Sequence, residues 1–335
     1  MQENLSDRDW KGWWNALVAF GWWGFVFPLV LLWAKSEGRI EKASVVRWSL
    51  ELLSLRVVFC VVFCFLLLVF LGRLQQFRQV FQSRQLLVGF LVSAFLIFLN
   101  WLGFIVGASM NNLSQASLGY YMGPLFNVVL GYFFLAEKLR RFQFAAVCIA
   151  GTGIVWLICM AGEFPWIALC LATSFGFYGL VRKKMQVDSV VGLTMETLYC
   201  VPVCLVILVL LASGREGLVF TEGSSLLRWI VLFTGPATAI PLICFAVAAK
   251  RLRLGTLGFI QFIAPTGQLI LAMVFDAKPI TGEKLIGYSF VWAAVAVYLV
   301  DLGLQRRGVS RGKKEEQAFP SGSSTAELKS NNPTE

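Results

Sequence analysis

Ten apolar stretches, separated by short polar or charged segments, follow one another along this 335-residue chain. Most of them reach the ~20 residues that a helix needs to cross ~30 Å of hydrocarbon. Backbone N–H and C=O groups find no water inside a bilayer, so each stretch must satisfy its own groups, which favours helices over strands. The stretches are 12–34, 54–72, 86–110, 114–135, 142–161, 165–181, 189–213, 226–249, 254–275 and 283–304. The sequence therefore predicts an all-α integral membrane protein with ten transmembrane helices.

Composition agrees with that class and argues against a catalytic or metal-binding protein. Hydrophobic residues make up 58% and charged residues 14% of the chain, and the mean hydropathy is +0.72. There is no histidine, which removes the commonest general base and the commonest metal ligand. All eight cysteines fall inside predicted helices, where packing is favoured over a metal site or a disulfide. We predict no catalytic residue, no metal and no cofactor.

Two short patterns recur at an interval close to half the chain. Residues 20–24 read Phe-Gly-Trp-Trp-Gly, and residues 175–179, which begin 155 positions later, read Phe-Gly-Phe-Tyr-Gly. Pro124 and Pro265, which are 141 positions apart, are each followed three residues later by a carboxamide. A half with five helices is odd-numbered, so the second half must enter the membrane in the opposite sense. This predicts two inverted-topology repeats with a binding site near the midplane between them.

The predicted organisation has four parts: an N-terminal tail at 1–11, a first repeat at 12–162, a second repeat at 163–305 and a disordered tail at 306–335. If the N-terminus is inside, Lys and Arg number 19 on that side and eight on the other. This bias predicts that both termini are cytoplasmic. The net charge of +10 is then a topology signal rather than a nucleic-acid-binding surface, because it is scattered over short loops. The start of the chain lacks a basic segment and a cleavage site, so the first helix is expected to stay attached.

Aromatic residues at membrane depth are the first candidates for a binding site. Tryptophans at 13, 14 and 33 fit the two interfacial belts, which places Trp22 and Trp23 near the midplane. Either these two residues fill space, or one of them lines a substrate cavity. Tyr178 is the equivalent aromatic of the second pattern, and its hydroxyl needs a partner when it is buried.

Amide and hydroxyl groups at the same depth are the second set of candidates. Pro124 and Pro265 are predicted to interrupt helices four and nine, and Asn127 and Gln268 follow on roughly the same face. These carboxamides either join helices by hydrogen bonds or bind substrate across the repeat interface. The same two interpretations apply to Asn100, Tyr120 and Gln261.

Charged candidates are few. Glu196 lies about seven residues into helix seven, where it is expected to remain wet. It is either an interfacial cap or a proton- or cation-linked coupling site. Glu51 and Arg56, at the predicted start of helix two, either pair locally or guard an entrance.

Runs of residues in both halves resemble the RarD family of EamA-type transporters, within the drug/metabolite transporter superfamily. The resemblance covers nearly all of residues 12–304, and it is carried by 100–102 (Asn-Trp-Leu), 116–120 (Ala-Ser-Leu-Gly-Tyr), Pro124, Asn127, Glu137, 174–183, Glu196, 256–259 (Thr-Leu-Gly-Phe), Gln261 and Pro265. It implies ten helices in two five-helix repeats in the cytoplasmic membrane of a bacterium. Two departures weaken any coupling role carried over from the family: Gln115 replaces an acid, and 276–279 read Asp-Ala-Lys-Pro instead of Gly-Glu-Lys-Pro.

The expected function is secondary active transport of a small organic metabolite or drug by alternating access. RarD is associated by name with chloramphenicol sensitivity, and wider superfamily members move amino acids, nucleotide sugars or S-adenosylmethionine. Midplane aromatics and neutral amides suit a planar or cationic solute, so exchange of S-adenosylmethionine for S-adenosylhomocysteine and amino acid transport are alternatives. A membrane-embedded enzyme and a channel are alternatives of a different class. The expected partners are a small-molecule substrate and the lipid bilayer, without nucleic acid, and the oligomeric state is left open.

Overall fold

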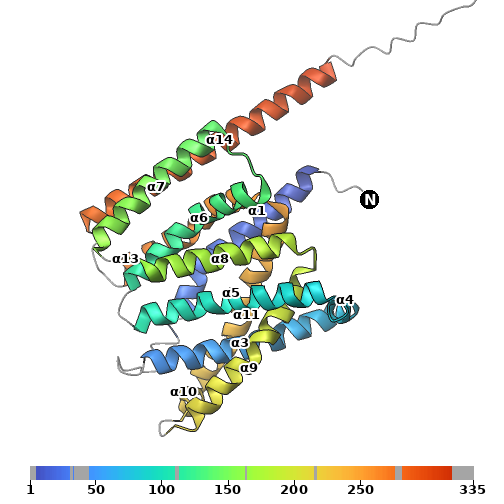
Figure 1. The fold of residues 1–335 in the computed structure, drawn as a ribbon, viewed down its shortest axis with the longest axis vertical. Helices are drawn as coiled ribbons and strands as arrows, with labels where there is room; N and C mark the ends of the chain where they lie inside the picture. The colour runs from blue at the N-terminus through green and yellow to red at the C-terminus, as the bar shows by residue number, and fades with distance from the viewer. Residues whose placement is uncertain are drawn as a thin grey trace, which may run out of the picture.

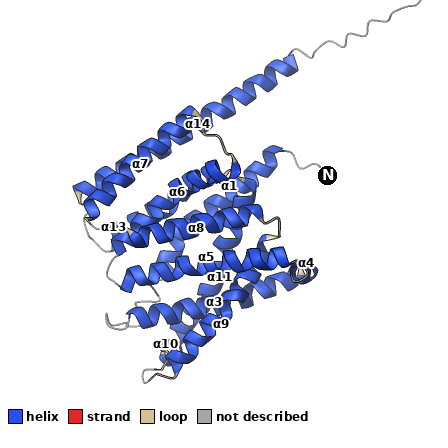
Figure 2. Ribbon diagram, in the orientation of Figure 1, coloured by secondary structure: helices blue, strands red, loops and turns tan. Residues whose placement is uncertain are grey.

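The computed structural model of the chain describes residues 5–30, 33, 45–109, 113–162, 164–214, 217–275 and 281–318. Regular structure in these residues is helical throughout (Figure 1, Figure 2). The helices of the first half are α1 (Leu5–Gly21) with its continuation η1 (Trp22–Val26), α3 (Val45–Phe70), α4 (Leu74–Val80), α5 (Arg84–Ser109), α6 (Leu113–Leu135) and α7 (Arg141–Ala161). Those of the second half are α8 (Trp166–Lys184), α9 (Ser189–Ala212), α10 (Val219–Glu222), α11 (Ser225–Arg251), α12 (Leu254–Gln261), α13 (Ile263–Phe275) and α14 (Gly282–Ala318).

Ten of these segments form the membrane bundle. Nine spans in the described residues are long and apolar enough to cross a bilayer, and α12 and α13 share one of them. The tenth segment is α8, whose hydropathy is lowered by the Arg-Lys-Lys sequence in its last turn. Its 19 residues give a length of about 28 Å, and it packs against both α5 and α6 (Figure 1). The prediction of an all-α membrane protein with ten transmembrane helices is confirmed.

Helix contacts follow the inverted repeat. The five segments of the first half correspond in order to those of the second, so α1 matches α8, α3 matches α9, α5 matches α11, α6 matches α12–α13 and α7 matches α14. The pairs α3–α9, α6–α12 and α7–α14 are each their own image when the halves are exchanged, and all three are in contact. The contact of α1 with α11 becomes that of α8 with α5, which is also present. The two halves therefore pack around a shared axis.

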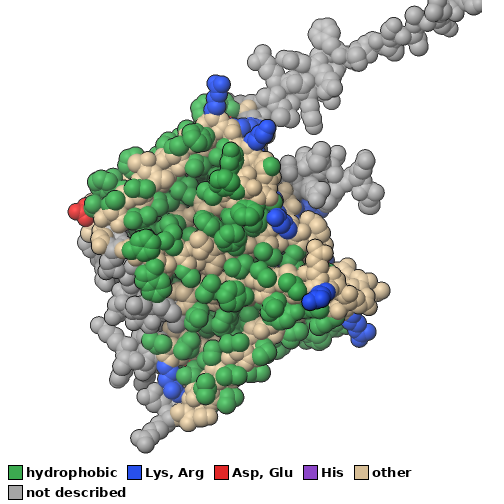
Figure 3. Space-filling model, in the orientation of Figure 1, with side chains coloured by type: hydrophobic (Ala, Val, Ile, Leu, Met, Phe, Trp, Pro, Cys, Tyr) green, Lys and Arg blue, Asp and Glu red, His purple; other side chains and the backbone are tan. Residues whose placement is uncertain are grey.

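The outer surface has the character expected of a lipid-facing one. Figure 3 shows mostly hydrophobic side chains across the visible face, with Lys and Arg mainly along its upper and right-hand edges; α4 lies at the right-hand edge in Figure 1. Phe70, Phe133 and Phe164 are 86%, 74% and 74% exposed, which would be costly in water. The start of α1 and the end of α14 lie toward the same side of the bundle (Figure 1).

Several helix boundaries differ from the sequence-based expectation. Helix two begins at Val45 rather than at 54, so Arg56 lies near the middle of α3 instead of at its start. Glu51 does not pair with Arg56; its carboxylate accepts hydrogen bonds from the N–H groups of Val219 and Phe220 at the start of α10. α14 continues to Ala318, so residues 306–318, expected to be disordered, are helical here. Residues 276–279 and 319–335 lie outside the described residues, as does the side chain of Gln115.

The two prolines expected to interrupt helices behave differently. α6 runs unbroken through Pro124, so the predicted interruption of helix four is wrong. Helix nine does break, at Phe262 between α12 and α13. Pro265 explains that position, because its ring lacks the N–H that would continue the hydrogen-bond ladder to residue 261.

A π-helical turn in the first helix was not predicted. In η1 the N–H of Phe27 donates to the carbonyl of Trp22 rather than to that of Trp23. The next possible donor to the Trp23 carbonyl is residue 28, a proline without an N–H. The Trp23 carbonyl accepts instead from the Gln268 side-chain Nε2 on α13, at 3.1 Å. Gln268 thus supports the local backbone of the opposite repeat.

Candidate functional site

The aromatic residues of the two recurring patterns meet in the centre of the bundle. Phe20 and Trp23 from the first repeat and Phe175 and Tyr178 from the second pack around Phe245 of α11; these five residues are called the aromatic cluster. The ring centroids of Trp23 and Phe175, one from each pattern, are 5.7 Å apart. Tyr178 stacks on Phe245 at 5.8 Å with an interplanar angle of 15°. The cluster therefore joins α1–η1, α8 and α11 at the interface between the repeats.

An amide pair lies beside this cluster. The Asn127 Nδ2 on α6 donates to the Gln261 Oε1 on α12 at 2.8 Å, and both residues are buried. The Asn127 Oδ1 is buried without a partner among the described residues. A side chain on Gly179 would bring its Cβ to 3.9 Å from this oxygen and 3.2 Å from Phe245, so the pair and the cluster are neighbours. In this structure the two carboxamides join the helices directly, across the repeat interface.

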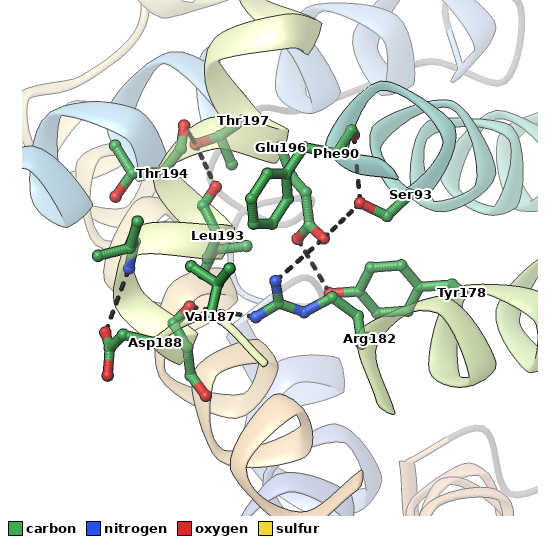
Figure 4. Close-up of polar contacts among 12 residues, drawn as sticks. Phe90, Ser93, Tyr178, Arg182, Val187, Asp188, Leu193, Thr194, Glu196 and Thr197 are labelled. Carbon is green, nitrogen blue, oxygen red and sulfur yellow. Dashed lines mark hydrogen bonds and ion pairs between the residues drawn. The ribbon is translucent and has the colours of Figure 1, made fainter. Parts of the chain in front are cut away.

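Glu196 connects to the cluster through a network of buried charges (Figure 4). Its Oε1 accepts from Ser93 Oγ at 2.7 Å and its Oε2 accepts from Tyr178 OH at 3.2 Å. Arg182 Nη1 lies 3.5 Å from Oε1, and both residues are 1% exposed. Glu196 is therefore buried, and the expectation that it remains in contact with water is wrong. These four residues, with the Ser189 carbonyl that accepts from Arg182 Nη2, are called the Arg182 network.

Arg182, in the last turn of α8, was not among the candidates taken from the sequence. It is enclosed, with its guanidinium 5.8 Å from the ring of Phe90. Space for it is made by Gly192, because a Cβ at that position would lie 1.9 Å from Arg182 Nη1. The available signal was spacing: Arg182 follows Tyr178 by four residues, so both occupy one face of α8. Ser93 and Phe245 gave no comparable signal, since their roles depend on tertiary packing.

The remaining candidates lie around these groups. Asn100 on α5 donates to the Leu171 carbonyl at 2.9 Å and to Ser174 Oγ at 3.2 Å, which ties α5 to α8. Tyr120 packs with its ring centroid 6.2 Å from that of Phe104 and lies near Arg56. The Trp22 Nε1 is buried without a hydrogen-bond partner among the described residues.

Glu137 ties the halves together just after the end of α6. Its Oε1 accepts from the N–H of Leu254 at 2.8 Å and its Oε2 from that of Gly255 at 3.1 Å, at the start of α12. A carboxylate is stabilised at this position by the helix dipole. Lys183 Nζ and Arg253 Nε each approach it to 3.9 Å. One acid thus links both repeats at one end of the bundle.

Comparison with known proteins gives a consistent result. Residues 42–159 match the model of the EamA-like transporter family. An uncharacterized transporter of Vibrio cholerae is 37% identical over 87% of this chain and 92% of its own length. Protein RarD of Escherichia coli is 37% identical over 78% of this chain and 88% of its own. A protein of known crystal structure, 17% identical, shares the fold with a TM-score of 0.64 over 87% of this chain and 96% of its own. The chain therefore belongs to the RarD family of EamA-like transporters, within the drug/metabolite transporter superfamily.

Proposed function

We propose that this protein is a secondary active transporter that carries a small organic metabolite or drug across the cytoplasmic membrane of a bacterium. Transport proceeds by alternating access, in which one repeat rocks against the other. Both termini lie in the cytoplasm in this proposal, which is supported by the excess of Lys and Arg in the loops on their side.

One observation carries the proposal: the aromatic residues of both recurring patterns meet at the interface of the repeats. A site built from residues of both repeats changes its contacts when the repeats move relative to each other. A solute bound there is therefore directly affected by the change between the inward-open and the outward-open state. Aromatic faces and the adjacent Asn127–Gln261 pair offer stacking and hydrogen bonds to an organic solute rather than coordination to an inorganic ion. Exchange of adenosyl compounds and amino acid transport both remain within this chemistry.

The direct test is uptake and efflux of a labelled metabolite panel by purified protein in proteoliposomes. Saturable movement of one or more organic solutes, competed by the unlabelled solute, is expected. Replacing Trp23 by Ala should reduce it at least tenfold, whereas replacing the lipid-exposed Trp229 by Ala should leave it unchanged. Solute-independent ion currents, or chemical conversion of a panel member without transport, would show that the protein is a channel or an enzyme instead.

We further propose that Glu196 couples transport to an ion gradient, because it is bonded to Tyr178 of the aromatic cluster. Glu196→Gln should abolish gradient-driven uptake while exchange of solute for solute persists. Glu283→Gln removes an exposed acid and is the matched control. Unchanged gradient-driven uptake by Glu196→Gln means that coupling resides elsewhere.

A further inference from the structure

Arg56 is a charged residue at membrane depth. Neither the helix packing nor the aromatic cluster described above explains why a charge is placed there. It is the twelfth residue of the 26-residue α3, which puts it about 16 Å from the helix start. An arginine stays protonated in essentially any protein environment, and its side chain is too short to reach the bilayer surface from the midplane. Such a residue at that depth needs either a partner or a function.

The described residues supply no acid for it. No hydrogen bond or ion pair joins Arg56 to any residue that the structure describes, and its Nε is buried without an acceptor. Its surroundings are two rings, those of Trp101 and Phe27, with centroids 4.8 Å and 5.6 Å from the guanidinium carbon. Tyr120, Cys60 and Cys204 are its other near neighbours. Arg56, Phe27, Trp101 and Tyr120 are together called the Arg56 site.

The Arg56 site adjoins the aromatic cluster. Cys60, one helical turn after Arg56 on α3, belongs to the same buried core as Phe20, Tyr178 and Phe245. Trp101 packs against that core as well. A solute whose apolar body contacts the aromatic cluster can therefore place a polar group at the guanidinium.

We propose that Arg56 binds the carboxylate of the transported solute. Rings that pack near the guanidinium carbon hold its plane by cation–π contact, while its N–H groups stay available in that plane. Those N–H groups form a fork that matches the two oxygens of a carboxylate. A single positive charge without a second cation among its neighbours fits a monovalent carboxylate better than a phosphate dianion. The inference rests on the proposed transport function and narrows its substrates to organic acids and zwitterions.

The binding test uses pairs of probes that differ only in this charge. Phenylacetate and phenylacetamide, phenylalanine and phenylalaninamide, and further acids with their own amides are titrated into the purified full-length protein, with thermal stabilisation as the readout. For one or more pairs the acid is expected to bind at least tenfold more tightly than its amide. Arg56→Gln should abolish that preference, Arg56→Lys should retain part of it, and Arg228→Gln, which changes an exposed arginine, should retain all of it. The proposal is overturned if no acid is preferred over its amide, or if the preference survives in Arg56→Gln.

A second measurement separates ligand binding from a structural role. Without ligand, Arg56→Met removes a charge that has no acid to leave behind, so the melting temperature should hold or rise. A fall as large as that caused by Arg182→Met would mean that Arg56 only holds the fold, which overturns the proposal. Proteoliposome transport distinguishes the two failures. Saturable transport of neutral solutes that is unchanged in Arg56→Gln would contradict this inference alone. Binding of acids without any transport would contradict the transporter proposal.

Discussion

Arg182, in the last turn of α8, and Arg56, near the middle of α3, are both arginines inside the membrane bundle, yet their surroundings are opposites. Arg182 has a carboxylate at 3.5 Å and a backbone carbonyl at 3.3 Å, and it is fully enclosed by α5, α8 and α9. Arg56 has two aromatic rings near its guanidinium carbon and no acceptor among the described residues. Burial of a charge is costly unless it is paired. Arg182 is paired within the protein through its two Nη atoms, although its Nε has no partner among the described residues. For Arg56, the partner proposed above is the carboxylate of the solute.

The comparison teaches that an arginine inside the bundle does not by itself mark a binding site. Both residues would be singled out by a rule that treats intramembrane charge as functional. What separates them is the state of their hydrogen-bonding groups, which depends on neighbours far apart in sequence. Perturbing each region should therefore have different consequences for stability and for binding.

The largest expected effect comes from breaking the Arg182 network. Arg182→Met leaves Glu196 buried without its cation, so the free energy of unfolding should fall by about 3–5 kcal/mol. Chemical denaturation in detergent micelles, followed by tryptophan fluorescence, measures the change. The double variant Arg182→Met/Glu196→Gln should recover part of the loss, because it removes the stranded charge. A loss no greater than that of the exposed-site variant Arg228→Met would show that the pair is not structural.

A smaller effect is expected where the backbone makes room for Arg182. Gly192→Ala places a Cβ 1.9 Å from Nη1, which forces the guanidinium out of position and should cost about 1–3 kcal/mol of stability. Gly21→Ala is the matched control, because that glycine is helical and a Cβ there meets nothing within 4 Å. Equal stability of the two variants, measured by thermal unfolding, would mean that Arg182 can move freely.

The region near Arg56 can be perturbed without touching the arginine. Gln268→Met removes the donor to the Trp23 carbonyl in η1, the turn that leads into Phe27. The expected loss of stability is about 1 kcal/mol, with weaker acid preference in the paired-probe titration. Gln186→Met, at an exposed glutamine, serves as the control. If acid preference is unaffected, η1 does not help to position the Arg56 site.

The smallest effect concerns the rim of the Arg182 network, where Asp188 precedes α9 and pairs with Arg73. Burial raises the pKa of Asp188, but hydrogen bonds from Arg73 and from the N–H groups of Val191 and Val190 outweigh it, so the pKa lies below its ordinary 3.8. A lowered pKa means that this stabilisation is complete above that ordinary value and is lost as pH falls through the folded-state pKa. Asp188→Asn keeps a capping side chain and should cost about 0.2–1 kcal/mol at neutral pH. The difference from the unaltered protein should vanish in acid, and a difference that is constant across a pH titration of stability would contradict this account.

Sequence alone predicted the number and type of helices, because apolar length is a local property. It also predicted two inverted repeats, and in the structure the aromatic residues of their recurring patterns touch, Trp23 against Phe175. The start of helix two was missed because Arg47, Glu51 and Arg56 dilute its apolar character, although Glu51 is satisfied by the amides of α10. Arg182 was missed because its partner Glu196 lies on another helix. A local sequence pattern does not show which side chains of distant helices will pair.

The π-turn η1 and the break at Phe262 lie against each other, and this contact constrains motion. A Cβ on Gly24 would come within 3.1 Å of the Ile263 carbonyl, and one on Gly267 within 3.0 Å of the Gly24 backbone. Both transmembrane segments are thus discontinuous at the same level, and their far portions touch backbone to backbone. Neither backbone can come closer to the other, so any movement of one portion toward the other must displace both. Because η1 belongs to the first repeat and α13 to the second, this contact limits how far one repeat can rock toward the other on that side.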